Sequence, residues 1–286
     1  MFAQVALVSQ TKKIALDELN VVAAALQKQV VRDFGPIWSV HASVSAFGQL
    51  NQIPLGSWAI IVRDDIQEPG AAGYHSNRKN GQPFALVQYE KNWTLTASHE
   101  CLEMLADPFG NRTVASNSLK AGQGRVLYLV EVCDPSEDVK YAYSADGVLV
   151  SDFYTPNFFD PKAASGVRYS FTGDIKAPRK VLDGGYISWW DPASKHLFQE
   201  FVQGTKTQIV DQGLVPEGLS LREHSDRSSE TRRSKVIRSG VPKGLLQTAM
   251  VRNVAGAPAA GKSAVDKSAH AYATDLQKQI TALMKT

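Results

Sequence analysis

The segment Ser98-His99-Glu100-Cys101-Leu102-Glu103 holds the residues best suited to chemistry. On an α-helix, residues four apart project from nearly the same side, so His99 and Glu103 could bind one cation through an imidazole nitrogen and a carboxylate oxygen. Glu100 lies about a third of a turn away, where it could act as general base toward a cation-activated water. In the His-Glu-x-x-His motif the second ligand is a histidine, whereas Glu103 stands there in this chain. The alternative is a solvated helix face whose glutamates only aid solubility.

Three more carboxylates could complete such a site. Glu131 and Asp134 follow the apolar run that starts at Leu127, and a strand end there could deliver a third and a fourth oxygen ligand. The alternatives are a surface residue for Glu131 and an ordinary turn at Asp134-Pro135. Asp107 is a further candidate ligand just beyond the helix, or else a turn residue before Pro108. We expect zinc, although a site this rich in oxygen could prefer calcium, magnesium or manganese.

Other histidines and tyrosines are weaker candidates. His75 lies in a segment that reads as a loop and could face a cleft, while His41 and His196 are interpreted as structural. Tyr154 and Tyr186 could donate a hydrogen bond to an oxyanion, although packing is the simpler role for both. Their placement depends on the surrounding elements.

Hydrophobic periodicity predicts the elements that position these residues. Apolar residues at three- and four-residue steps indicate a helix over residues 16–34, and the stretch over residues 94–106, with Thr94 as N-cap, is a second helix. Residues 71–80, rich in Gly, Ser and Asn, read as a loop. Strands are expected at residues 38–44, 58–62, 83–89 and 125–132. This order predicts an α+β or mixed α/β domain with a twisted mixed sheet.

Composition and charge indicate one main domain and a tail. The 286 residues suffice for one sizeable core, which we assign to residues 1–217. That part has 19 basic and 23 acidic residues, a net charge of −4, whereas residues 218–286 have 12 and 5, a net charge of +7. The tail reads as a flexible linker at residues 255–264 and a helix at residues 267–284. It lacks interleaved aromatic residues, which disfavours nucleic-acid binding, although the basic charge keeps such binding open.

Two further features bear on location. The sequence has no apolar run of the ~20 residues that span a bilayer and no signal peptide, so we expect a soluble cytoplasmic protein with no membrane partner. Two cysteines, Cys101 and Cys133, are too few for a disulfide framework and fit a reducing compartment. A single disulfide bond between them is the alternative.

The string from Ser98 to Pro108, followed by Glu131-Val132-Cys133-Asp134, resembles uncharacterised zincin-like proteins with a Ser-His-Glu-x-x-Glu-x-x-x-(Asp/Asn)-Pro signature. The later Glu-x-x-Asp is also similar to a motif in the Exordium-like proteins, and the order of the preceding elements resembles the metzincin half-domain. The resemblance implies a zinc-peptidase-like core with His99 and Glu103 as ligands and Glu100 as base. Glu131 or Asp134 would complete the site.

Two functions follow from these residues. The first is a metal-dependent hydrolase, most simply a zinc metallopeptidase, whose peptide or protein substrate lies along an edge strand at residues 83–89. The second is a catalytically inactive zincin-like protein in which the cation serves stability and the basic tail binds a partner. The replacement of the second histidine by Glu103 and the long tail favour the second function.

Overall fold

The computed structural model describes residues 2–68 and 70–225, and these form a mixed α+β protein. They belong to the first of two compact units of the chain, which extends to Arg252. The predicted linker at residues 255–264 and the predicted helix at residues 267–284 lie outside the described residues. No helix in the described ranges is both long and apolar enough to cross a membrane.

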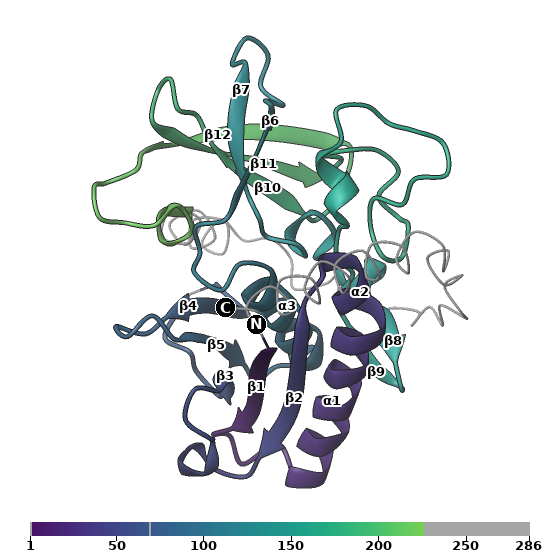
Figure 1. The fold of residues 1–286 in the computed structure, drawn as a ribbon, viewed down its shortest axis with the longest axis vertical. Helices are drawn as coiled ribbons and strands as arrows, with labels where there is room; N and C mark the ends of the chain where they lie inside the picture. The colour runs from purple at the N-terminus through teal and green to yellow at the C-terminus, as the bar shows by residue number, and fades with distance from the viewer. Residues whose placement is uncertain (1, 69, 226–286) are drawn as a thin grey trace, which may run out of the picture. The chain divides into compact units, whose positions relative to one another are not determined.

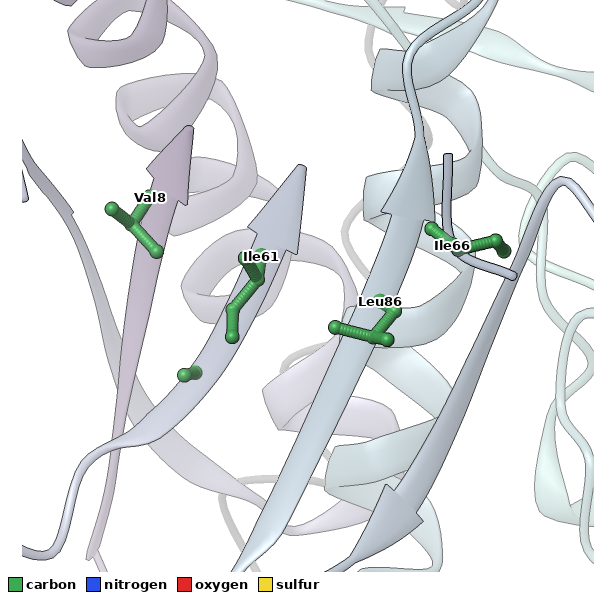
Figure 2. Packing of buried hydrophobic residues seen from close by; sticks show 5 residues of the cluster. Val8, Ile61, Ile66 and Leu86 are labelled. Atoms are coloured by element: carbon green, nitrogen blue, oxygen red, sulfur yellow. The ribbon is translucent and has the colours of Figure 1, made fainter. Parts of the chain in front are cut away.

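The first sheet has five strands in the order β2-β1-β3-β5-β4 (Figure 1). Strands β1 (Phe2–Ser9), β2 (His41–Phe47), β3 (Trp58–Arg63) and β5 (Pro83–Gln88) run parallel to their neighbours, and β4 (Gly73–Asn77) pairs antiparallel with β5 at the edge. The central strands are buried on both faces, which explains their continuous apolar runs. Figure 2 shows Val8, Ile61 and Leu86 on one face of these strands, with the helices passing behind.

Two helices cover the sheet. Helix α1 (Leu16–Lys28) packs against β2 and continues as a π-helical stretch (Gln29–Phe34) and a short helix α2 (Gly35–Trp38). Helix α3 (Trp93–Ala106) packs against β3, β4 and β5. Its N-cap is Asn92, and Thr94, the predicted cap, instead donates its hydroxyl to the carbonyl of Leu149 at 3.0 Å.

The π-helical stretch begins at a buried glutamine that holds three segments together. Gln29 donates to the hydroxyl of Tyr143 at 3.1 Å and to the carbonyl of Ser151 at 2.9 Å. It also accepts a hydrogen bond from the hydroxyl of Ser98 at 2.7 Å. Because Ser98 precedes His99 on α3, this network fixes the rotation of the helix that carries the candidate site.

A second sheet follows α3 and is antiparallel throughout, with the order β12-β11-β10-β7-β6. Its strands are β6 (Thr113–Asn117), β7 (Arg125–Leu129), β10 (Tyr186–Trp190), β11 (His196–Gln203) and β12 (Lys206–Leu214). A two-stranded ribbon, β8 (Tyr143–Ala145) and β9 (Val148–Val150), lies between β7 and β10 in sequence, and β9 contacts α3.

Several predictions about the first sheet were wrong. Strand β1 was not predicted, and the predicted loop at residues 71–80 contains β4. The strand predicted at residues 38–44 begins only at His41, because Trp38 closes α2 and Ser39 adopts a left-handed conformation with φ 56°. Residues 83–89 were expected at an edge, but β5 lies between β3 and β4, so β4 is the edge strand.

Candidate metal centre

One helix, one edge strand and one loop bring the candidate residues together. Helix α3 carries His99, Glu100 and Glu103, and it is buried on most sides because Cys101, Leu102, Met104 and Leu105 also point into the core. Strand β4 adds a histidine, and the loop after β7 adds two carboxylates. We call this set the acid–histidine cluster, and its members are His75, His99, Glu100, Glu103, Glu131 and Asp134.

The first half of the cluster surrounds His99. Its Nε2 atom lies 3.2 Å from Oε2 of Glu103, one helical turn away, and 3.3 Å from Oδ1 of Asp134. The other Glu103 oxygen, Oε1, accepts a hydrogen bond from the backbone N–H of Cys133 at 3.0 Å. That bond ties α3 to the loop after β7, so the spacing of the three side chains depends on both elements.

The second half surrounds His75 on β4. Its Nδ1 atom lies 3.1 Å from Oε2 of Glu100 and 3.8 Å from Oε2 of Glu103, and its Nε2 atom lies 3.8 Å from Oε2 of Glu131. Strand β4 can approach α3 this closely because residue 73 is glycine. A Cβ atom at Gly73 would lie 2.6 Å from Cγ2 of Thr96 and 2.9 Å from Oε1 of Glu100.

Arg222 closes one side of the cluster. Its Nε atom donates to Oε1 of Glu131 at 2.8 Å, and its Nη2 atom donates to the carbonyl of Asp107 at 3.1 Å and lies 3.6 Å from the Asp107 carboxylate. Only 5 % of Arg222 is exposed. The guanidinium therefore supplies a buried positive charge to Glu131 and Asp107.

Burial and mutual repulsion shift the acid groups. Burial, reinforced by the charge of Glu103, raises the pKa of Asp134 to about 6, although His99 and Tyr186 oppose the shift. Burial also raises the pKa of Glu131 well above its usual value; Arg222 opposes this, and Glu103 and Asp134 add to it. The pKa of the Cys133 thiol is likewise raised well above its ordinary value by burial, so the residue stays a thiol.

The two histidines shift in opposite directions. Burial, the charge of Arg222 and the charge of His99 together lower the pKa of His75 well below its usual value, so its imidazole is neutral. For His99, burial opposes protonation, but the Glu103 charge and the hydrogen bonds to Asp134 and Glu103 raise its pKa well above the usual value. In the metal-free protein a proton therefore sits on His99, where it competes with a cation.

Two tyrosines adjoin the cluster. The Tyr154 side chain is buried, and its hydroxyl has no hydrogen-bond partner among residues 2–68 and 70–225. Burial and the charges of Glu131, Glu103 and Asp134 raise its pKa well above the ordinary value, so it remains a neutral donor. Tyr186 forms a hydrogen bond with Asp134 that lowers the pKa of that carboxyl. Tyr186 thus orients a candidate ligand.

The structure brings five of the six predicted site residues into the cluster. Asp107 is the exception, because its carboxylate accepts the backbone N–H groups of Asn111 and Arg112 at 3.2 and 2.9 Å and so ends the helix. His196 pairs with Asp211 at 2.9 Å, and His41 is exposed on β2. Cys101 and Cys133 are both free.

Sequence reasoning missed one cluster member and the arginine beside the cluster. His75 was treated as a lone loop histidine, and Arg222 was assigned to the tail. Within the part of the chain that the structure describes, three groups of side chains have ligand atoms within 4.8 Å of one another, and these groups also include Cys133 and Glu137. The groups are His99, Glu103 and Cys133; His75, Glu103 and Glu131; and His99, Asp134 and Glu137. The Gly73-Tyr74-His75 sequence was the available signal, because glycine there permits the close approach of β4 to α3.

The cluster has the charge and the orphaned atoms of a cation site. Its four carboxylates, those of Glu100, Glu103, Glu131 and Asp134, face a single guanidinium, which leaves three negative charges when the carboxylates are ionised and both imidazoles are neutral. Within the described part of the chain, Nε2 of His75 and Oε2 of Glu131 are buried without a hydrogen bond. Such atoms are costly to bury unless a cation or a proton satisfies them.

In comparisons with known proteins, no family model, no curated protein and no solved structure matches the chain.

Proposed function

We propose that the protein is a metal-dependent hydrolase, a zincin-like zinc metallopeptidase in its chemistry. The observation that carries the proposal is the position of His99 Nε2, 3.2 Å from Glu103 and 3.3 Å from Asp134, on the helix that also carries the buried Glu100. Ligand atoms about 2.1 Å from a tetrahedral ion lie about 3.4 Å apart, which agrees with the distances from His99 Nε2 to Glu103 and from His99 Nε2 to Asp134.

The donor set favours a transition metal. One imidazole nitrogen and two carboxylate oxygens suit zinc, manganese or iron, whereas calcium and magnesium prefer oxygen donors alone. Zinc is the first choice because three side-chain ligands leave a fourth position for water, as in catalytic zinc sites. When bound, the cation supplies Lewis acidity and lowers the pKa of a coordinated water.

Glu100 is the residue we assign to proton transfer. It adjoins His99 in sequence, its carboxylate is buried, and its Oε2 atom lies 3.1 Å from Nδ1 of His75. In peptide hydrolysis the carboxylate would take a proton from the attacking water and pass it to the leaving amine. The Tyr154 hydroxyl is buried, neutral and without a hydrogen-bond partner in the described ranges. It would donate a hydrogen bond to the developing oxyanion.

Strand β4 is where we expect the substrate. It is the edge of the first sheet, and its central residue, His75, points into the cluster while Tyr74 packs against the apolar face opposite. An extended peptide that adds to this edge as a further strand would pass its backbone beside the cluster. This location replaces the earlier expectation of binding along residues 83–89.

Substitution of Glu100 tests the proposal. Glu100→Gln should abolish turnover of a mixed peptide library while the variant binds as much Zn²⁺ as the wild type, because the amide keeps the shape but takes no proton. His99→Ala should lose turnover and bind less Zn²⁺ than the wild type, and His41→Ala, on the exposed face of β2, should lose neither property. Elemental analysis and mass spectrometry of the library measure the two properties. Turnover that persists in Glu100→Gln would contradict the assignment.

One observation favours the inactive alternative. His99 belongs to two groups of potential ligands, one with Glu103 and Cys133 and the other with Asp134 and Glu137, so donors beyond the three assigned ligands lie near it. A closed sphere is the mark of a structural cation. Water-proton relaxation of the Mn²⁺-loaded protein separates the two functions, since only an open site enhances the relaxation rate through an exchanging water.

A further inference from the structure

The cluster contains two buried polar atoms without hydrogen bonds that do not belong to the three side chains assigned to the first cation. Nε2 of His75 and Oε2 of Glu131 lie 3.8 Å apart, and neither forms a hydrogen bond within the described ranges. His75 is 4 % exposed, and the Glu131 side chain is 11 % exposed. Solvent therefore has little access to either atom.

The tautomer of His75 makes this pair unfavourable without a cation. Nδ1 of His75 lies 3.1 Å from Oε2 of Glu100, and a carboxylate in that position accepts a hydrogen bond from an Nδ1–H group. The proton of the ring therefore sits on Nδ1, and Nε2 presents a lone pair toward Glu131. The lone pairs of His75 Nε2 and Glu131 Oε2 then face each other and repel. A cation bound between these two atoms would remove the repulsion. A carboxylate that orients the far nitrogen of a ligating histidine is the usual arrangement at metal sites.

We propose that the cluster binds two divalent cations, the second held by Nε2 of His75 and the carboxylates of Glu131 and Glu103. The inference rests on the proposed first cation and deepens it. These three side chains form one of the groups whose ligand atoms all lie within 4.8 Å of one another. In this arrangement Glu100 also positions His75.

Glu103 is placed to bridge the two cations. Its Oε1 atom is held by the backbone N–H of Cys133, so Oε2 is the atom that faces both histidines. Oε2 lies 3.2 Å from Nε2 of His99, and Glu103 shares the group whose ligand atoms lie within 4.8 Å of one another with His75 and Glu131. Two-metal hydrolases hold their ions about 3.5–4 Å apart, a separation that one shared carboxylate spans.

The charge of the cluster supports two cations rather than one. The three negative charges that remain in the cluster after Arg222 is counted exceed the charge of one divalent ion. Arg222 contacts Oε1 of Glu131 and so leaves Oε2, the atom nearest His75, for the cation. One divalent ion alone would leave one buried carboxylate without a counter-charge, which is the costly case.

Counting bound ions tests the proposal. The full-length protein, freed of metal and dialysed against Mn²⁺, should hold two ions per chain, and its electron paramagnetic resonance spectrum should show a spin-coupled pair. His75→Ala should hold one ion with the six-line spectrum of isolated Mn²⁺. Glu131→Gln keeps an oxygen for Arg222 and should also hold one. His41→Ala, at the opposite edge of the first sheet, is the matched control and should hold two.

Each count has one meaning. A single ion in the wild type, or two ions in a folded His75→Ala, overturns the second site and leaves the proposed hydrolase intact. Two coupled ions in a protein that hydrolyses no peptide refute the hydrolase and support the second site. A wild type that binds no ion overturns both, and this measurement on the wild type stands even if the variants do not fold.

Discussion

The raised pKa of Asp134 predicts that removing a candidate ligand stabilises the metal-free protein. The carboxyl titrates at about 6 in the folded protein and at its ordinary 3.8 when unfolded. Between these values the folded protein holds a proton that the unfolded chain has released, so the free energy of unfolding falls as pH rises through this window. Above pH 6 the whole cost applies, and about two pKa units correspond to about 3 kcal/mol.

Asp134→Asn removes that cost because the amide has no charge. Without metal, the variant should be more stable than the wild type by up to about 3 kcal/mol at pH 8, and the difference should shrink to about 1 kcal/mol at pH 4.5. Urea unfolding in the presence of a chelator at the two pH values measures it. With Zn²⁺ added, the wild type should gain stability and Asp134→Asn should gain little, because a ligand is missing.

Asp152 provides the matched control. It is fully buried, its pKa is also raised to about 6 by burial, and it is absent from the three groups of potential ligands. Asp152→Asn should therefore also be more stable than the wild type at pH 8, yet it should respond to Zn²⁺ as the wild type does. The reasoning is refuted if Asp134→Asn is less stable than the wild type at pH 8, or if its stability difference is the same at both pH values.

Three further predictions concern the rest of the cluster. A cation at a hundred times its Kd should add about 3 kcal/mol to the free energy of unfolding, and thermal unfolding with and without chelator should show a rise of several degrees; an unchanged Tm would count against a cation site. Gly73→Ala should move β4 away from α3, because the added Cβ meets Thr96 and Glu100, and the variant should bind Mn²⁺ at least tenfold more weakly; titration calorimetry that shows wild-type affinity would contradict this. Arg222→Met should destabilise the metal-free protein by about 3 kcal/mol in urea unfolding, since Glu131 loses its counter-charge, and the loss should be smaller once Zn²⁺ is bound; an equal loss in both states would argue against a cation beside Glu131.

The local part of the site was predictable from sequence. The spacing of His99 and Glu103 on a helix requires only helical geometry, and α3 has the predicted bounds to within one residue. Glu131 and Asp134 follow an apolar strand, so their position at the end of β7 could also be inferred. Both predictions rely on neighbours in sequence, where periodicity is informative.

The non-local part was not predictable in this way. His75 reaches the cluster only because β4 turns back antiparallel to β5, and Gly73-Tyr74-His75-Ser76-Asn77 lacks the apolar alternation that marks a strand. Arg222 approaches from a segment that follows both sheets, and no pattern in the sequence assigns it a partner. Strand β1 is different, because its run from Val5 to Val8 is the apolar stretch expected of a buried parallel strand.

The ion pair between Arg222 and Glu131 has a consequence for the order of events during synthesis. Ninety-one residues separate the two partners, so both sheets leave the ribosome before the guanidinium does. A nascent chain that has been synthesised as far as the end of β12 would contain Glu131 but not Arg222, its counter-charge. The buried carboxylates of such a chain would repel one another. Charge balance at this centre is therefore reached late in translation, and ion capture by the nascent chain could relieve the repulsion before Arg222 arrives.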